Sequence, residues 1–269
     1  MGKRIAWMGW LAMIDDNWLF IGTDSRLAAC SEIMAERGFT TRHAGVDHYT
    51  EELGECITDY SPRQIVFPIL QMKGSIPPAL LEKGTELYTG VASEEWLKSF
   101  KEAGLLVNSY LKEEQFIWQN AKLTAEGFIH DYYSHTRRSI FETHFYVAGF
   151  GKVGKATAHA LASLGAKVTV LARSDAQLGE ASIHGYKTER LTDDWGIKEG
   201  NLINTIPAKW LSVSESTGLH IFDLASAPGC LKEQLSSEYY TVLLGLPGKH
   251  FPVDAAVALA NALERMYRR

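Results

Sequence analysis

The stretch 146–174 constrains the fold more than any other part of the chain, and it reads YVAGFGKVGKATAHALASLGAKVTVLARS. An apolar segment is followed by a turn with three glycines, a helix-like segment and a second apolar segment, as in a unit that binds a dinucleotide. Gly149 would permit the tight turn, Gly151 would let the backbone approach a pyrophosphate, and Gly154 would let the helix lie close to the sheet. The alternative is a βαβ turn whose glycines serve only packing, but the context for a dinucleotide site is complete. We therefore predict cofactor contacts at Gly149, Gly151, Lys152, Val153 and Gly154.

The end of the second apolar segment indicates which dinucleotide is bound. A carboxylate at this point would accept hydrogen bonds from the ribose of NAD, but the chain reads LARS at 171–174. Arg173 offers a forked cation and Ser174 a hydroxyl, and this pairing suits a 2′-phosphate. Asp175 stands one residue further on, where it can cap the next helix instead. We predict NADP rather than NAD as the cofactor, bound by Arg173 and Ser174.

The spacing of apolar segments predicts an α/β chain. In the second half, apolar and β-branched segments alternate with helix-sized segments, as in a parallel sheet covered on both faces. These expected strands are 145–149, 167–172, 201–205, 220–225 and 241–245. The first half alternates more weakly, and its expected elements are strands at 19–22 and 65–68 and helices at 27–37 and 94–102.

Two further helices are expected, one that Thr124 caps and that runs to Arg138, and one over 253–267. We therefore predict two domains. The first is a smaller, substrate-side α/β domain over 1–123, and the second is a Rossmann-type NADP-binding domain with a doubly wound parallel sheet over 124–269. The helix 253–267 is expected to pack back on the first domain.

Composition and spacing exclude several classes of protein. With 46% hydrophobic and 22% charged residues and a formal charge of −5, the chain is typical of a globular protein and not of a nucleic-acid binder. Its apolar start is interrupted at Asp15 and Asp16, so we expect no membrane span and predict a cytoplasmic protein. The three cysteines lie far apart, which argues against a disulfide framework or a zinc ribbon. His130 and His135 miss the i, i+4 spacing of a helical metal pair, so no metal site is predicted.

Several polar residues follow the later expected strands, and ligands of a doubly wound sheet bind outside the carboxyl ends of its strands. On this ground Asn204, Thr205, Pro207 and Ser226 are predicted cofactor contacts. For Asn204 and Thr205 the alternative is a polar turn that ties down the strand end. Asp223 either caps a neighbouring loop or orients a polar group in the site.

Ordered phrases along the chain resemble those of the dipicolinate synthase A family. They are IGTDSR at 21–26, TAEG at 124–127, GFGKVG at 149–154, LARS at 171–174, NTIP at 204–207, DLASAPG at 223–229 and GLPG at 245–248. Single phrases of this kind also occur in shikimate dehydrogenases and other two-domain dehydrogenases. The resemblance implies an NADP-dependent oxidoreductase that forms dipicolinate (pyridine-2,6-dicarboxylate) from a cyclic dicarboxylate derived from 4-hydroxy-tetrahydrodipicolinate.

The same resemblance implies a partner and a location. The partner is dipicolinate synthase B, the flavoprotein-like second component of the enzyme. The location is the mother-cell cytoplasm of a sporulating bacterium. We further predict a homo-oligomer.

The chain departs from the family pattern near the expected active-site edge. The loop after GLPG carries Lys249, His250, Val253 and Asp254 where the family is more apolar, and Cys230 replaces a glycine. An extra stretch also precedes the first expected strand.

A substrate with two carboxylates requires cations that face it. Arg26 follows the first expected strand and is the predicted substrate ligand, with a surface helix position as the alternative. Lys249 is the second predicted substrate ligand, ahead of Lys73, although a solvated loop lysine is the alternative for both.

No side chain stands out as the general base that aromatisation needs, and Glu126 and His250 are the catalytic candidates. Glu126 could instead favour the dipole of the helix that it is expected to open. Two other functions stay open: an NADP-dependent dehydrogenase of another small carboxylate, and a non-catalytic NADP-binding subunit.

Overall fold

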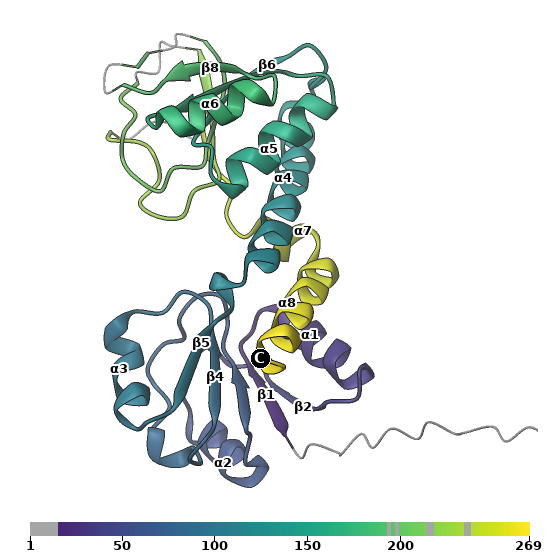
Figure 1. Cartoon of the computed structure of the whole chain (residues 1–269), viewed down its shortest axis with the longest axis vertical. Helices are drawn as coiled ribbons and strands as arrows, with labels where there is room; N and C mark the ends of the chain where they lie inside the picture. Colours follow the sequence, from purple (N-terminus) through teal and green to yellow (C-terminus); the bar gives the residue numbers. More distant parts are fainter. Residues whose placement is uncertain (1–15, 193–194, 197–198, 214–217, 234–237) are drawn as a thin grey trace, which may run out of the picture. The chain divides into compact units, whose positions relative to one another are not determined.

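The chain divides into two compact units, each built on one parallel sheet (Figure 1). The computed structural model describes residues 16–192, 195–196, 199–213, 218–233 and 238–269. Unit 1 comprises Met1–Leu111 and Leu263–Arg269, and unit 2 comprises Lys112–Ala262. The predicted boundary between residues 123 and 124 falls inside a helix of unit 2.

Unit 1 contains a five-stranded sheet in the order β2-β1-β3-β4-β5, and all its strand pairs are parallel. Its elements in chain order are β1 (Asn17–Ile21), α1 (Ser25–Glu36), β2 (Thr40–Ala44), α2 (Glu51–Tyr60), β3 (Gln64–Val66), the 3₁₀ helix η1 (Pro78–Leu80), β4 (Glu86–Thr89), α3 (Glu94–Glu102), β5 (Leu106–Ser109) and the 3₁₀ helix η2 (Tyr110–Lys112).

Helix α3 shows how the sequence sets these elements. The side chain of Ser93 accepts a hydrogen bond from the backbone N–H of Trp96 and so caps the helix, and Glu94 and Glu95 favour its N-terminal dipole. Trp96 and Phe100 lie one turn apart on the same face and are buried against the sheet. The helix predicted over 94–102 is therefore confirmed.

Unit 2 contains a six-stranded parallel sheet in the order β11-β10-β9-β6-β7-β8. Its elements are α4 (Glu114–Thr136), β6 (His144–Ala148), α5 (Lys152–Ser163), β7 (Lys167–Ala172), α6 (Asp175–Ile183), β8 (Lys187–Arg190), β9 (Gly200–Asn204), β10 (Leu219–Asp223), β11 (Tyr240–Val242), α7 (Leu246–His250) and α8 (Pro252–Tyr267), the last of which ends in unit 1. The strand order reverses between β6 and β9, so a crevice for ligands is expected at the carboxyl ends of these two strands.

The two faces of this sheet are covered differently. Alternate residues of β6, β7, β9 and β10 enter two separate apolar cores; on β6, for example, Val147 belongs to one core and Ala148 to the other. Helices α4, α5 and α6 cover the first face. The second face is covered by Trp195, Trp210 and Leu211, which lie in non-helical segments. Between β8 and β11 no helix occurs among the described residues, so the described parts of the expected helix-sized segments are irregular.

The last residues of α8 pack within unit 1. The ring of Tyr267 lies edge-on to the ring of Trp18 at 5.5 Å between centroids, and its hydroxyl donates to Asp16. Glu264 forms an ion pair with Arg37 at 2.6 Å.

One helix prediction is wrong at its start. Helix α4 begins ten residues before Thr124 and is capped by Glu113, whose carboxylate accepts from the backbone N–H of Phe116 at 2.7 Å. Thr124 lies inside the helix and donates its hydroxyl to the carbonyl of Asn120. Glu126 therefore does not open the helix; it lies half-exposed in the middle and faces Lys122 at 3.8 Å.

Candidate functional site

The glycine turn joins β6 to α5 as the sequence predicts. Gly149 has a φ of +90°, which favours glycine, and a Cβ at this position would lie 2.6 Å from the hydroxyl of Thr205. A Cβ at Gly154 would lie 2.1 Å from the carbonyl oxygen of Gly149, so this glycine is needed for α5 to approach β6. A Cβ at Gly151, in contrast, would meet no atom within 4 Å. The backbone of Gly151 therefore presents an open face.

The N-terminus of α5 is available for an anion. Gly151 is its N-cap and offers no side-chain cap, so the first backbone N–H groups of the helix have no side-chain acceptor there. Lys152 is the first helical residue, and its ammonium group lies 3.2 Å from Glu114 at the start of α4. Val153 is half-buried beside it.

A second arginine joins the predicted phosphate site at the end of β7. Arg173 and Ser174 follow β7 directly and are exposed, and α6 begins at Asp175 as expected. Arg190, at the end of the neighbouring strand β8, donates a hydrogen bond to the carbonyl of Arg173 at 2.8 Å and pairs with Asp175. Sequence reasoning missed Arg190 because β8 reads KTER, which has no apolar pattern.

The ends of β9 and β10 are tied together by a buried polar network. The amide of Asn204 donates to the carboxylate of Asp223 at 2.7 Å, and its oxygen accepts from the indole of Trp210 at 3.0 Å. Asp223 also accepts from the hydroxyl of Tyr240 at 2.6 Å and from the backbone N–H of Cys230 at 2.8 Å. Burial raises the pKa of the Cys230 thiol, and the nearby charge of Asp223 raises it further. Asn204 and Asp223, both fully buried, therefore hold the loops that follow the strands.

Other predicted cofactor contacts at the carboxyl ends of these strands are more exposed than Asn204. Pro207 and Ser226 are exposed in the loops after β9 and β10. Thr205 is half-buried and donates its hydroxyl to the carbonyl of Ala148 at 2.9 Å, next to the glycine turn. The structure thus brings Thr205 to the glycine turn, and contact of these side chains with a cofactor stays a prediction.

Arg26 lies in the first turn of α1 in unit 1, where its side chain is paired with Asp24. Its guanidinium Nε lies 2.9 Å from each carboxylate oxygen of Asp24, and its Nη2 also pairs with Asp24. Burial raises the pKa of Asp24, but the hydrogen bonds from Arg26 outweigh this effect, so the pKa lies below its usual range. A substrate carboxylate would have to share Arg26 with Asp24.

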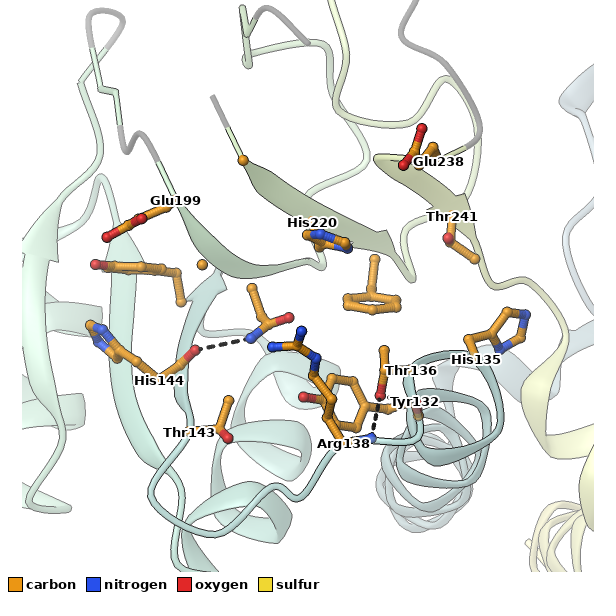
Figure 2. A pocket seen from close by; sticks show the side chains of 15 residues that line it. Tyr132, His135, Thr136, Arg138, Thr143, His144, Glu199, His220, Glu238 and Thr241 are labelled. Atoms are coloured by element: carbon orange, nitrogen blue, oxygen red, sulfur yellow. Dashed lines mark hydrogen bonds between the residues drawn. The ribbon is translucent and has the colours of Figure 1, made fainter. Parts of the chain in front are cut away.

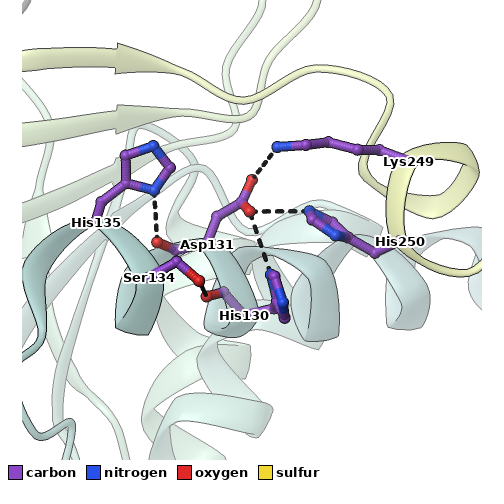
Figure 3. Close-up of polar contacts among 6 residues, drawn as sticks. All are labelled: His130, Asp131, Ser134, His135, Lys249 and His250. Atoms are coloured by element: carbon purple, nitrogen blue, oxygen red, sulfur yellow. Dashed lines mark hydrogen bonds and ion pairs between the residues drawn. The ribbon is translucent and has the colours of Figure 1, made fainter.

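Lys249 and His250 meet a residue that sequence reasoning did not single out (Figure 3). Asp131 of α4 is buried, and its carboxylate lies 2.9 Å from the ammonium group of Lys249 and 2.9 Å from Nε2 of His250. His130 Nδ1 lies 3.3 Å from the same carboxylate. Gly127 permits this arrangement, because a Cβ there would lie 2.9 Å from Leu246 and 3.3 Å from the His250 ring.

This cluster is distant from the glycine turn. Lys152 pairs with Glu114 at the beginning of α4, whereas Asp131 lies seventeen residues further along the same helix. At the rise of an α-helix this corresponds to about 25 Å. The predicted roles of Lys249 in substrate binding and of His250 in catalysis stay predictions, but the two side chains lie along α4 rather than at the turn.

A pocket of about 830 Å³ lies at the opposite edge of the same sheet (Figure 2). It is lined by residues at the starts of strands, such as His144 of β6 and His220 of β10, and by Arg138 beyond the end of α4. Burial lowers the pKa of His144, and Lys187 and Lys167 lower it further. None of the predicted cofactor or substrate residues lines this pocket.

Comparison with known proteins supports the sequence resemblance. No protein-family profile matches the chain. Over 172 residues it is 32% identical to dipicolinate synthase A of Bacillus subtilis (strain 168), one subunit of that synthase, which corresponds to 60% of this chain and 57% of that protein. The sequence match therefore spans little more than half of the length of this curated relative.

Solved structures share the fold over a longer stretch. The crystal structure of dipicolinate synthase A from Bacillus halodurans superposes with a TM-score of 0.78 at 21% identity and covers 94% of this chain and 97% of that chain. A transhydrogenase from Sinorhizobium meliloti superposes with a TM-score of 0.62 at 15% identity and covers 93% of this chain and 92% of that chain. The predicted fold class, two-domain α/β with a Rossmann-type doubly wound sheet, is thereby confirmed.

Among the residues that the structure describes, no helix combines the length and apolar character that a membrane crossing needs. The chain resembles dipicolinate synthase A in the sequence of the matched stretch and in the fold of nearly its whole length.

Proposed function

We propose that unit 2 binds NADP and that the chain is the oxidoreductase subunit of a dipicolinate-forming enzyme. The observation that carries the proposal is the glycine turn, where Gly149 and Gly154 are required by close contacts whereas Gly151 faces open space. Packing alone explains Gly149 and Gly154, but it does not explain a glycine at 151. A pyrophosphate that approaches the Gly151 backbone at the uncapped start of α5 does explain it.

The end of β7 supports NADP rather than NAD. Arg173 is exposed there, Ser174 adds a hydroxyl, and the carboxylate of Asp175 is paired with Arg190. The Arg173 guanidinium therefore lies where the adenosine ribose is expected, and the carboxylate of Asp175, which would repel a phosphate, is paired with Arg190. A 2′-phosphate carries the negative charge that complements this arrangement.

The proposed reaction converts a dihydropyridine dicarboxylate, which 4-hydroxy-tetrahydrodipicolinate gives by loss of water, to the aromatic pyridine-2,6-dicarboxylate by loss of one hydride and one proton. NADP supplies the hydride acceptor when it is bound, and a proton leaves the ring to a base or to water. The substrate class follows from the product that the similar protein, dipicolinate synthase A, is named for. Arg26 of unit 1 is proposed to bind one substrate carboxylate, and dipicolinate synthase B is the proposed partner.

The test is an assay of dipicolinate formation from 4-hydroxy-tetrahydrodipicolinate, with NADP or NAD, and with or without dipicolinate synthase B. We expect product and stoichiometric NADPH only with NADP, at a higher rate when the partner is present. Oxidation of another small carboxylate, with no dipicolinate formed, would identify a different dehydrogenase. NADP binding without turnover of any carboxylate, even with the partner present, would identify a non-catalytic protein that only binds the cofactor.

A further inference from the structure

The cluster around Asp131 has the composition and the spacing of a metal site. His130 Nδ1, an oxygen of Asp131 and His250 Nε2 all lie within 4.8 Å of one another. The Asp131 Oδ1 atom lies 3.3 Å from the His130 nitrogen and 2.9 Å from the His250 nitrogen. Zinc binds imidazole nitrogen and carboxylate oxygen at about 2.0–2.2 Å, so ligand atoms on a tetrahedral ion lie roughly 3.3–3.5 Å apart. Small side-chain rotations would bring these three atoms to that spacing.

The ring nitrogen of His250 supplies an independent indication. His250 Nε2 is buried and forms no hydrogen bond, although it lies 2.9 Å from Oδ1 of Asp131. A buried polar atom without a partner is costly. An ion bound by the imidazole and the carboxylate would satisfy this nitrogen.

The two carboxylate oxygens of Asp131 have different neighbours. Lys249 occupies the second carboxylate oxygen, Oδ2, at 2.9 Å, and so leaves Oδ1 for the two histidines. The His130 and His250 rings are 4.4 Å apart between centroids, so both imidazoles lie beside this oxygen.

We propose that His130, Asp131 and His250 form a binding site for one divalent transition-metal ion of the zinc type. Two nitrogen ligands and one oxygen ligand suit Zn²⁺ better than Mg²⁺, which prefers oxygen, and three protein ligands leave a fourth position for water. The side chain of His130 is 59% exposed, which provides an entry path. The ion would fasten α7 to α4 and thereby stabilise unit 2, some distance from the proposed NADP site.

The experiment is zinc titration of the metal-free chain, produced without a histidine tag, by calorimetry and by thermal unfolding. We expect one Zn²⁺ per chain, no comparable binding of Mg²⁺, and a rise of about 5 °C in the unfolding midpoint at zinc 100-fold above its Kd. Bound Co²⁺ should show the visible absorption of a tetrahedral site.

Variants on the same helix make the test specific. His130→Ala should fold normally because its side chain is mostly exposed, and it should lower zinc affinity at least tenfold. Asp131→Asn should lower it further. His135→Ala is the matched control and should keep the parent affinity, since among the described residues its ring hydrogen-bonds the Asp131 backbone carbonyl, at 2.7 Å, and not the carboxylate. The absence of stoichiometric zinc binding, or equal affinity in His130→Ala and the parent, would overturn the proposal.

Discussion

At the scale of single residues, Arg173 decides the proposed cofactor preference. A hydrogen bond to a charged group contributes about 1.5–3 kcal/mol, so Arg173→Ala should reduce NADP affinity about ten- to a hundredfold. NAD, which lacks the 2′-phosphate, should lose much less. Calorimetry with both cofactors measures the difference, and Arg138→Ala, at the opposite edge of the sheet, is the control. A parent chain that prefers NAD, or a mutant that loses both cofactors equally, would contradict the phosphate site.

Asp24 sets a pH dependence of stability, again at the residue scale. Its pKa is lowered in the folded chain by Arg26, so its ionised form stabilises the fold at neutral pH and this contribution is lost as the pH falls through the lowered pKa. Asp24→Asn keeps an acceptor for the cap of α1 but removes the charge. Urea unfolding should therefore show the parent to be more stable at neutral pH and the two chains to converge in acid. A constant difference at every pH would show that the charge contributes nothing.

At the scale of elements, variants at the start of α5 distinguish glycines that are needed for packing from a glycine that is needed for cofactor binding. Gly151 has a φ of −79° and open space around its missing Cβ, so Gly151→Val should fold with nearly the parent stability. The added side chain would occupy the expected pyrophosphate position, and dinucleotide affinity should fall at least tenfold. Gly154→Ala should instead destabilise the chain, because its Cβ would clash with the Gly149 carbonyl.

Thermal unfolding and cofactor titration of both variants measure these effects. Gly179→Ala, on α6 with nothing near its Cβ, is the matched control and should be neutral or slightly stabilising. Undiminished dinucleotide binding by Gly151→Val would mean that the turn serves packing only.

The elements that could be predicted are those whose pattern is local. The strand predicted over 167–172 is β7, because alternate residues of its apolar run fill the cores on both faces of the sheet. Strand β8 was missed because its residues are all exposed, and only its pairing with β7 makes it a strand. The start of α4 was placed too late because the cap at Glu113 is a glutamate, which is not among the usual capping residues.

The residues of the candidate sites likewise divide into those that a local sequence pattern predicts and those that only the fold brings together. The glycine turn and Arg173 are encoded in one contiguous stretch, so spacing alone predicts them. The cluster of His130, Asp131 and His250 joins residues far apart in the chain, and Gly127 leaves room for α7 beside α4 there. No spacing rule within a single helix could find it.

At the scale of the whole molecule, the proposal assigns substrate binding to unit 1 and cofactor binding to unit 2. Arg26 lies in unit 1, so Arg26→Ala should weaken substrate binding about tenfold or more while the NADP affinity of unit 2 stays within about twofold of the parent. Because Arg26 also pairs with Asp24, Arg26→Ala should also lose some stability, and this loss must be measured separately from the loss of substrate binding.

Two further variants make the test specific. Arg26→Lys keeps the positive charge without the two-pronged guanidinium group and should give a KM between those of the parent and Arg26→Ala. Arg63→Ala, which removes an exposed pair with Glu82 in the same unit, is the control. Steady-state kinetics and NADP titration of these variants check the assignment. Equal substrate KM values in Arg26→Ala and Arg63→Ala would show that Arg26 does not bind the substrate. A loss of NADP affinity in Arg26→Ala as large as the loss of substrate affinity would show that the two roles are not divided between the units.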